Sequence, residues 1–142
     1  MKEIIIYLAG AVKNMPDEGS QWRREATNRF LQIEELSDIE IAIINPTKYF
    51  TYSENKHKTQ KQVKEFYLNK ILNCDLVLCN CDYSDSSIGT AQEIQYAVDH
   101  NIPVIGFGTK NMYPWITEVD CQVVFDTMDK AIEYIANYYL IN

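Results

Sequence analysis

The sequence predicts one α/β domain, a flavodoxin-like or Rossmann-like three-layer sandwich built on a five-stranded, mostly parallel sheet. Three observations predict it. Short runs of β-branched and other apolar residues alternate with segments whose apolar residues recur at helical spacing. These runs lack the polar–apolar alternation of half-exposed strands, so we expect helices on both faces of the sheet. The chain shows no linker, repeat or low-complexity tract, so residues 1–142 are expected to form a single domain.

Each predicted element follows from a local pattern. The first strand contains the run Ile4, Ile5 and Ile6, and the second ends at Asn45-Pro46, because proline cannot continue a ladder. The five predicted strands cover residues 4–8, 39–44, 75–79, 102–107 and 122–125. Amphipathic spacing predicts four helices, and Ser20 is the expected cap of the first. These helices cover residues 21–33, 59–73, 90–100 and 128–140.

Composition excludes several classes of function. The net charge of −7 and pI near 4.8 argue against a nucleic-acid partner, which would require a basic face. No apolar stretch reaches the roughly 20 residues of a membrane span, and the N-terminus lacks the layout of a signal peptide. We therefore expect a cytoplasmic protein that binds a small molecule and has no membrane partner.

The cysteines predict neither a disulfide framework nor a metal site. They lie on apolar segments, where intracellular thiols are most often small buried hydrophobes. Two of them are too close together for a zinc pair, and no second pair or nearby histidine completes a site. We expect no metal and no cofactor. The four are Cys74, Cys79, Cys81 and Cys121.

Three segments are expected to meet at the carboxyl ends of the strands, where open α/β sheets bind ligands. They are residues 7–10, the Asn45-Pro46 pair, and residues 82–93. In the third, Ser87, Gly89 and Thr90 precede a predicted helix, where hydroxyls and free backbone N–H groups bind anions or sugar hydroxyls. Glu93 is expected in the first turn of that helix, near the same edge.

Simpler interpretations compete with this one. Residues 90–93 match a capping box, in which Glu93 would bond back to the N–H of Thr90. A buried aromatic in the first strand is an equally ordinary role for Tyr7, although a phenol there can also hold a carboxylate in place. Lysines near the second helix suit either a solvated surface or a phosphate clamp. They are Lys56, Lys58, Lys61 and Lys64.

Taken together, these segments resemble the nucleoside 2-deoxyribosyltransferase family. The resemblance spans nearly the whole chain, and its strongest part is residues 87–97 running into residues 101–105. It is also carried by residues 6–10, the Trp22-Arg23 pair, the Asn45-Pro46 turn and residues 75–78. It implies retaining attack at an anomeric carbon, with a covalent glycosyl-enzyme.

The resemblance also implies roles for individual residues. Glu93 would be the nucleophile, and Tyr7 would position it. Residues 111–115 resemble the part that family members lend to a neighbouring subunit, which implies a homodimer or a higher homo-oligomer. In that segment Asn111 would bond the 5′ end of the sugar. The predicted substrate-binding residues are Gly10, Asn45, Asp82, Asp85, Ser87, Gly89, Thr90, Asn111 and Tyr113.

Two positions depart from the family pattern. Tyr67 stands where family members usually carry an aspartate, and Asp82 or Asp85 is the candidate replacement for that acid. Ser87 replaces the aspartate of the transferases, as in the branch that hydrolyses nucleoside 5′-monophosphates, where a hydroxyl suits a phosphate at a helix N-terminus. Three functions remain open: deoxyribosyl transfer between nucleobases, hydrolysis of nucleoside 5′-monophosphates, and nucleotide binding without catalysis.

Overall fold

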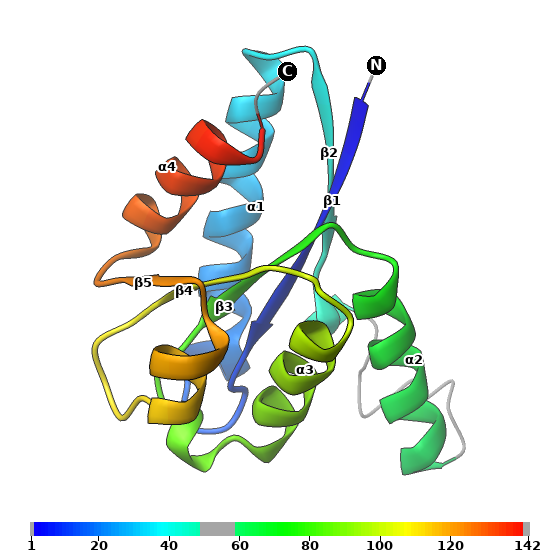
Figure 1. Ribbon diagram of the computed structural model, residues 1–142, viewed down its shortest axis with the longest axis vertical. Coiled ribbons are helices and arrows are strands. Elements are labelled where there is room, and N and C mark those ends of the chain that lie inside the picture. Colours follow the sequence, from blue (N-terminus) through cyan, green and yellow to red (C-terminus); the bar gives the residue numbers. More distant parts are fainter. Residues whose placement is uncertain (1, 49–58, 141–142) are drawn as a thin grey trace.

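Five parallel strands form the central layer of the computed structural model, which describes residues 2–48 and 59–140 (Figure 1). Their order in the sheet is β2-β1-β3-β4-β5, and every pairing between them is parallel. This is the flavodoxin-like order, so the predicted fold class is confirmed. The strands are β1 (Lys2–Gly10), β2 (Ile39–Ile44), β3 (Leu76–Asn80), β4 (Val104–Phe107) and β5 (Val123–Phe125).

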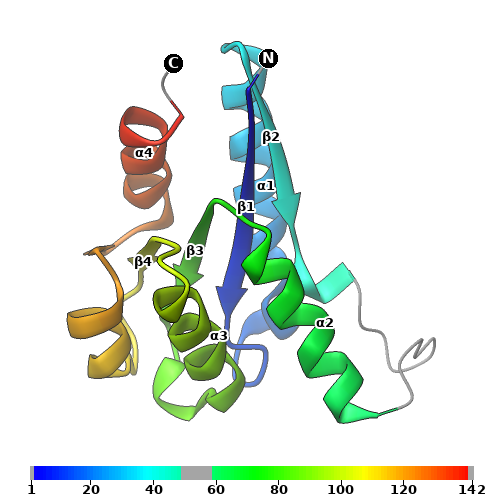
Figure 2. The same cartoon turned by 45° about the vertical axis from the view of Figure 1, so that its right-hand side comes forward.

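Two pairs of helices cover the two faces of this sheet (Figures 1 and 2). On one face lie α1 (Ser20–Glu35) and α4 (Met128–Tyr138). On the other lie α2 (Gln60–Leu72) and α3 (Ile88–Asp99). Among the described residues, no helix is both long and apolar enough to cross a membrane.

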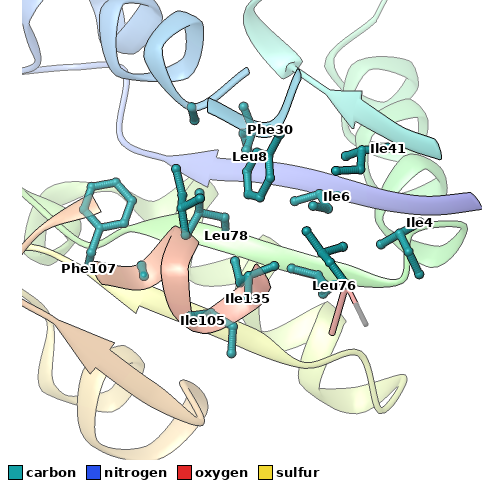
Figure 3. Packing of buried hydrophobic residues seen from close by; sticks show 14 of the residues in the cluster. Ile4, Ile6, Leu8, Phe30, Ile41, Leu76, Leu78, Ile105, Phe107 and Ile135 are labelled. Carbon is teal, nitrogen blue, oxygen red and sulfur yellow. The ribbon is translucent and has the colours of Figure 1, made fainter. Parts of the chain in front are cut away.

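The core consists of two clusters because alternate residues of each central strand point to opposite faces. Ile6 and Leu8 of β1 pack with Phe30 of α1 beneath α1 and α4 (Figure 3). Tyr7 and Ala9 join the cluster under α2 and α3. Phe30 is fully buried, so its truncation to alanine is expected to cost about 3–5 kcal/mol. All four cysteines are buried and free, as the sequence predicted.

Two helix starts differ from the sequence prediction. Ser20 is not the cap of α1: Gly19 is, in a left-handed conformation (φ 79°), and the Ser20 hydroxyl accepts instead from Arg24 (3.2 Å). Helix α3 begins at Ile88 rather than Thr90, because the Ser87 hydroxyl caps it by accepting from the backbone N–H of Thr90 (3.4 Å). Glu93 therefore lies in the second turn of α3, and the capping-box interpretation of this residue is wrong.

Two short helical turns lie between the main elements, at positions where the sequence analysis predicts no helix. Residues Pro16–Gly19 form a tight turn in which Asp17 and Glu18 also have left-handed backbone angles. Residues Trp115–Asp120 form a π-helical turn beside α3. Both segments flank the carboxyl end of the sheet, so they contribute to the cavities described next. The sequence also predicts an irregular, aromatic and basic loop over residues 47–58, of which residues 49–58 lie outside the described part of the chain.

Candidate active site

A hydrogen bond between Tyr7 and Glu93 lies at the carboxyl end of β1. Tyr7 is fully buried in the strand, and its hydroxyl donates to Oε2 of Glu93 on α3. The strand and the helix are distant in sequence, and the parallel sheet brings them together. A phenol held rigidly in a strand fixes the rotamer of the carboxylate, so the predicted pair is present.

Burial controls the protonation of both groups. Burial raises the pKa of Glu93 from its ordinary value of 4.5 to about 7, against the opposing effects of the Tyr7 hydrogen bond and the positive charge of Arg23. Burial, together with the nearby Glu93 carboxylate, raises the pKa of Tyr7 well above 10. At neutral pH the phenol is therefore a permanent donor, while the carboxyl group is divided between its two protonation states.

Two cavities meet at Glu93. The larger, about 670 Å³, lies among the carboxyl ends of β1 and β2, helix α1 and helix α2, and it is lined by Gly10, Arg23 and Thr47. The smaller, about 230 Å³, lies between α2 and α3 and includes Gly89. Glu93 and Tyr67 line both. The larger cavity falls in the usual size range of small-molecule sites, and the carboxylate is reachable from either side.

Tyr67 forms the wall between α2 and the carboxyl end of β2. Its hydroxyl donates to the carbonyl oxygen of Pro46 at 3.1 Å, and its ring lines both cavities. Burial, reinforced by the charge of Glu93, raises its pKa. The position at which the family resemblance implies an aspartate therefore presents an uncharged aromatic wall and a hydrogen-bond donor.

Arg23 is a site residue that we did not select from the sequence. It lines the larger cavity although only 2% of its surface is exposed, and its guanidinium donates to three backbone carbonyls. The helical spacing in α1 did not indicate that Arg23 is buried, because the apolar residues Trp22, Ala26 and Phe30 already account for the buried face of the helix. An arginine beside such a stripe is ordinarily expected at the surface, and only the tertiary structure shows it buried.

A third hollow lies across α3 from Glu93. It has a volume of about 440 Å³ and lies between the first turns of α3 and the π-helical turn. Three predicted substrate-binding residues line it: Asp85, Ser87 and Tyr113. The hydroxyl groups of Ser87 and Thr90 share a hydrogen bond of 2.7 Å. Ile88 and Gln92 line both this groove and the smaller cavity, so the two hollows adjoin.

The remaining predicted residues bond within the chain rather than line these hollows. The Asn45 side chain accepts from the backbone and hydroxyl of Thr47 (3.1 and 2.6 Å), which shapes the turn after β2. Asp82 accepts from the backbone N–H groups of Thr109 and Lys110 (2.8 and 3.0 Å), so it fixes a loop and does not stand beside Glu93. Thr90 is buried beneath Ser87, and Asn111 is exposed.

The predicted lysine cluster is only partly described. Lys64 lines the smaller cavity beside Gly89, whereas Lys61 is exposed and lies 3.9 Å from Glu65. Lys56 and Lys58 lie outside the described residues. Among those described, no group of three or more His, Cys, Asp or Glu residues is placed to hold a metal ion.

Comparison with protein families gives one match that covers most of the chain. The model for nucleoside 2-deoxyribosyltransferases matches residues 6–131, a range that contains both Tyr7 and Glu93. The chain belongs to the nucleoside 2-deoxyribosyltransferase family. It is therefore an enzyme, either a nucleoside deoxyribosyltransferase or a nucleotide N-glycosidase. A search of the curated proteins finds no match.

Solved structures of this family share the fold. A 2-deoxyribosyltransferase from Bacillus psychrosaccharolyticus aligns with TM-score 0.64 and 18% identity, over 89% of this chain and 88% of that one. The 2-desoxiribosyltransferase from Leishmania mexicana gives 0.66 and 17%, over 96% and 99%. The CMP N-glycosidase of Clostridium botulinum gives 0.52 and 17%, over 96% and 99%. At these identities the likeness establishes the fold, and the reaction is argued below from the residues.

Proposed function

We propose that this protein transfers 2-deoxyribose between nucleobases through a covalent glycosyl-enzyme on Glu93. The hydrogen bond from Tyr7 to Glu93, at the junction of the two cavities, is the observation that carries the proposal. A carboxylate nucleophile needs a fixed rotamer, access to the substrate and an ionised form near neutral pH. The buried phenol, the two cavities and the pKa of about 7 supply these three requirements.

The reaction proceeds in two displacements. In the first, Oε1 or Oε2 of Glu93 bonds to the anomeric carbon, and the C–N bond breaks with its electron pair passing to the base. In the second, a nitrogen of an incoming base bonds to the same carbon and releases the Glu93 carboxylate. The configuration at the carbon is retained because it is inverted twice. One larger cavity serves both bases, which occupy it in turn.

A specific observation favours a second candidate, hydrolysis of nucleoside 5′-monophosphates to base and sugar phosphate. Ser87 places an uncharged hydroxyl at the N-terminus of the 12-residue helix α3, where a carboxylate would repel an anion. Lys64 lies at the edge of the adjoining smaller cavity and would add a positive charge. In this reaction water, rather than a second base, resolves the intermediate on Glu93.

One set of incubations separates these functions. The protein is incubated with a deoxynucleoside and a second free base, and then with nucleoside 5′-monophosphates, and the products are separated by chromatography. A new deoxynucleoside supports transfer, and sugar phosphate with free base supports hydrolysis. If no substrate of either class turns over, both proposals fail and nucleotide binding without catalysis remains. Treatment with a slow 2-fluoro sugar substrate, followed by peptide mass analysis, locates the covalent adduct on Glu93.

We also propose that Asn111 completes the site of a neighbouring subunit in a homo-oligomer. Asn111 is exposed with a left-handed backbone (φ 47°), and its carbonyl accepts from the N–H of Asp85 (3.2 Å), so the loop is held while the side chain stays free for a second subunit. Mixing the Asn111→Ala and Glu93→Gln variants tests this. A 1:1 mixture should regain up to about a quarter of the wild-type activity, because about half of its dimers are hybrids and each hybrid has one intact site of two. If sedimentation shows that the fully active wild-type protein is a monomer, this proposal is refuted.

A further inference from the structure

Arg23 carries a buried positive charge that no direct ion pair neutralises. None of the ion pairs among residues 2–48 and 59–140 includes it, although its side chain is almost completely buried. Burying a cation is costly unless nearby groups compensate for the lost water. The hydrogen bonds of Arg23 to neutral backbone carbonyls offset only part of this cost, so we expect a negatively charged group near the guanidinium.

Three hydrogen bonds hold the guanidinium in one position. Nε donates to the Leu8 carbonyl (3.3 Å), Nη2 to the Gly10 carbonyl (2.9 Å) and Nη1 to the Gly19 carbonyl (3.0 Å). The planar fork therefore ties the carboxyl end of β1 to the turn before α1. The Trp22 ring lies beneath it, with Cζ 4.7 Å from the ring centroid. A Cβ added at Gly19 would lie 2.5 Å from Nη1, so a larger residue there would displace the guanidinium.

Glu93 is a carboxyl group that lines the larger cavity together with this fixed charge. Both residues line the larger cavity, and both lie at the carboxyl end of β1, one from α1 and the other from α3. Arg23 is the one buried cation among the described residues, and carbonyl dipoles orient its charge without cancelling it. A cation in a region that excludes water acts on a carboxylate more strongly than an exposed lysine does.

We propose that Arg23 is a positioning residue for the reaction: its buried guanidinium, fixed on three backbone carbonyls, supplies the positive charge that keeps Glu93 ionised. This inference rests on the proposed function, because it assigns a role relative to the Glu93 nucleophile. Formation of the glycosyl ester consumes the negative charge on Glu93, and release of the sugar restores it. Arg23 thus favours both the ionised resting enzyme and the departure of the carboxylate in the second displacement.

Other titratable groups also surround Glu93: the Tyr7 donor favours its ionised form, and the rest are neutral phenol and thiol groups or charged groups that line the two cavities. Tyr7 donates a hydrogen bond and remains neutral, while Tyr67 lies close by and also remains neutral. The acidic residues of the turn before α1 add negative charge at the mouth of the larger cavity. Among residues 2–48 and 59–140, these groups are Tyr7, Asp17, Glu18, Arg23, Lys64, Tyr67 and Cys79.

The test is to titrate Glu93 directly in the Arg23→Gln and Arg23→Lys variants. Glutamate labelled with ¹³C at the carboxyl group gives a resonance that is assigned by its loss in Glu93→Gln. Arg23→Gln should raise the midpoint by about one pH unit, the size expected for loss of a nearby opposite charge. Arg23→Lys should keep the wild-type midpoint, because it retains the charge while losing part of the hydrogen-bonded fork. An unchanged midpoint in Arg23→Gln overturns the proposal.

Activity and stability give two further readouts. With an ionisation midpoint near 7, Arg23→Gln should lower kcat/KM at pH 7 roughly fivefold and restore it at pH 9, whereas a purely structural role would lower activity equally at both. If Arg23→Gln does not fold, the Arg23→Gln/Glu93→Gln double variant should fold again at pH 9. A double variant that stays unfolded overturns the proposal. If wild type turns over no substrate, the proposed function fails, while the titration still decides the role of Arg23.

Discussion

Replacing Glu93 by glutamine should make the protein more stable at high pH while abolishing its activity. The folded state binds a proton at Glu93 that the unfolded chain releases, because burial raises the pKa from 4.5 to about 7. A carboxyl group with a raised pKa adds stability below pH 4.5, and that contribution is lost as the pH rises through 7. Glutamine keeps the shape of the side chain and its acceptor for Tyr7, but it does not titrate.

The size of the effect follows from the shift. Each pKa unit corresponds to about 1.4 kcal/mol, so linkage between pH 5.5 and 8.5 gives a full effect of about 2 kcal/mol. Glu93 is partly exposed to the cavity, which reduces this effect. As the pH rises from 5.5 to 8.5, we expect the free energy of unfolding of the wild type to fall by about 1–2 kcal/mol relative to that of Glu93→Gln. The variant should therefore gain relative stability where the enzyme is most active, which is the expected trade-off at a strained active site.

Urea unfolding at the two pH values measures this difference in the free energy of unfolding. Glu133→Gln on α4 is the matched control, since that side chain is exposed and far from the cavities in sequence and fold. It should follow the wild-type pH dependence and keep full activity. If Glu93→Gln shows the same pH dependence as the wild type, Glu93 does not titrate in the raised range. If it retains turnover, Glu93 is not the nucleophile.

Three further predictions concern Tyr7, Gly10 and Gly89. Tyr7→Phe removes the hydrogen bond to an ionised Glu93, so kcat should fall about 10- to 100-fold and the pH at half-maximal kcat/KM should rise; an unchanged pH profile would contradict the positioning role. Gly10→Ala should destabilise the fold by about 1–3 kcal/mol in thermal unfolding, because the new Cβ would lie 3.0 Å from Trp22. Gly89→Ala should fold normally, because no atom lies within 4 Å of the new Cβ. It should raise KM, because the added methyl group narrows the smaller cavity. If its kinetics match those of the wild type, Gly89 is not part of the site.

Local sequence patterns predicted the strands and helices correctly, but they predicted the residues at which helices begin less well. The apolar run of β1 and the helical spacing in α1 predicted a strand and a helix that the structure contains. Ser20 was wrong as the cap of α1 and Thr90 as the cap of α3, because a hydroxyl near a helix end indicates a cap without saying which residue is the cap. Gly19 and Ser87 hold those positions, one through a left-handed backbone and the other through its bond to Thr90.

The candidate site was predictable where residues follow strands directly. Tyr7 and Glu93 were selected because the carboxyl ends of parallel strands meet at one edge, and the resemblance to the family gave them roles. Asp82 was selected for the same reason, yet its carboxylate is taken up by backbone N–H groups of a later loop. Sequence proximity to the edge does not specify which side chain stays free for a ligand.

The sequence by itself determined the sheet, its covered faces, the edge that holds the candidate site and the family, since these follow from the order of apolar runs and from motifs in one stretch of chain. Only the tertiary structure decided which groups surround Glu93. It buried Arg23 against three carbonyls, placed Tyr67 as a wall and put Ser87 across α3 from Glu93. The physical reason is that burial and the electrostatic field at a carboxylate depend on distances between elements, and those distances are set when the layers pack.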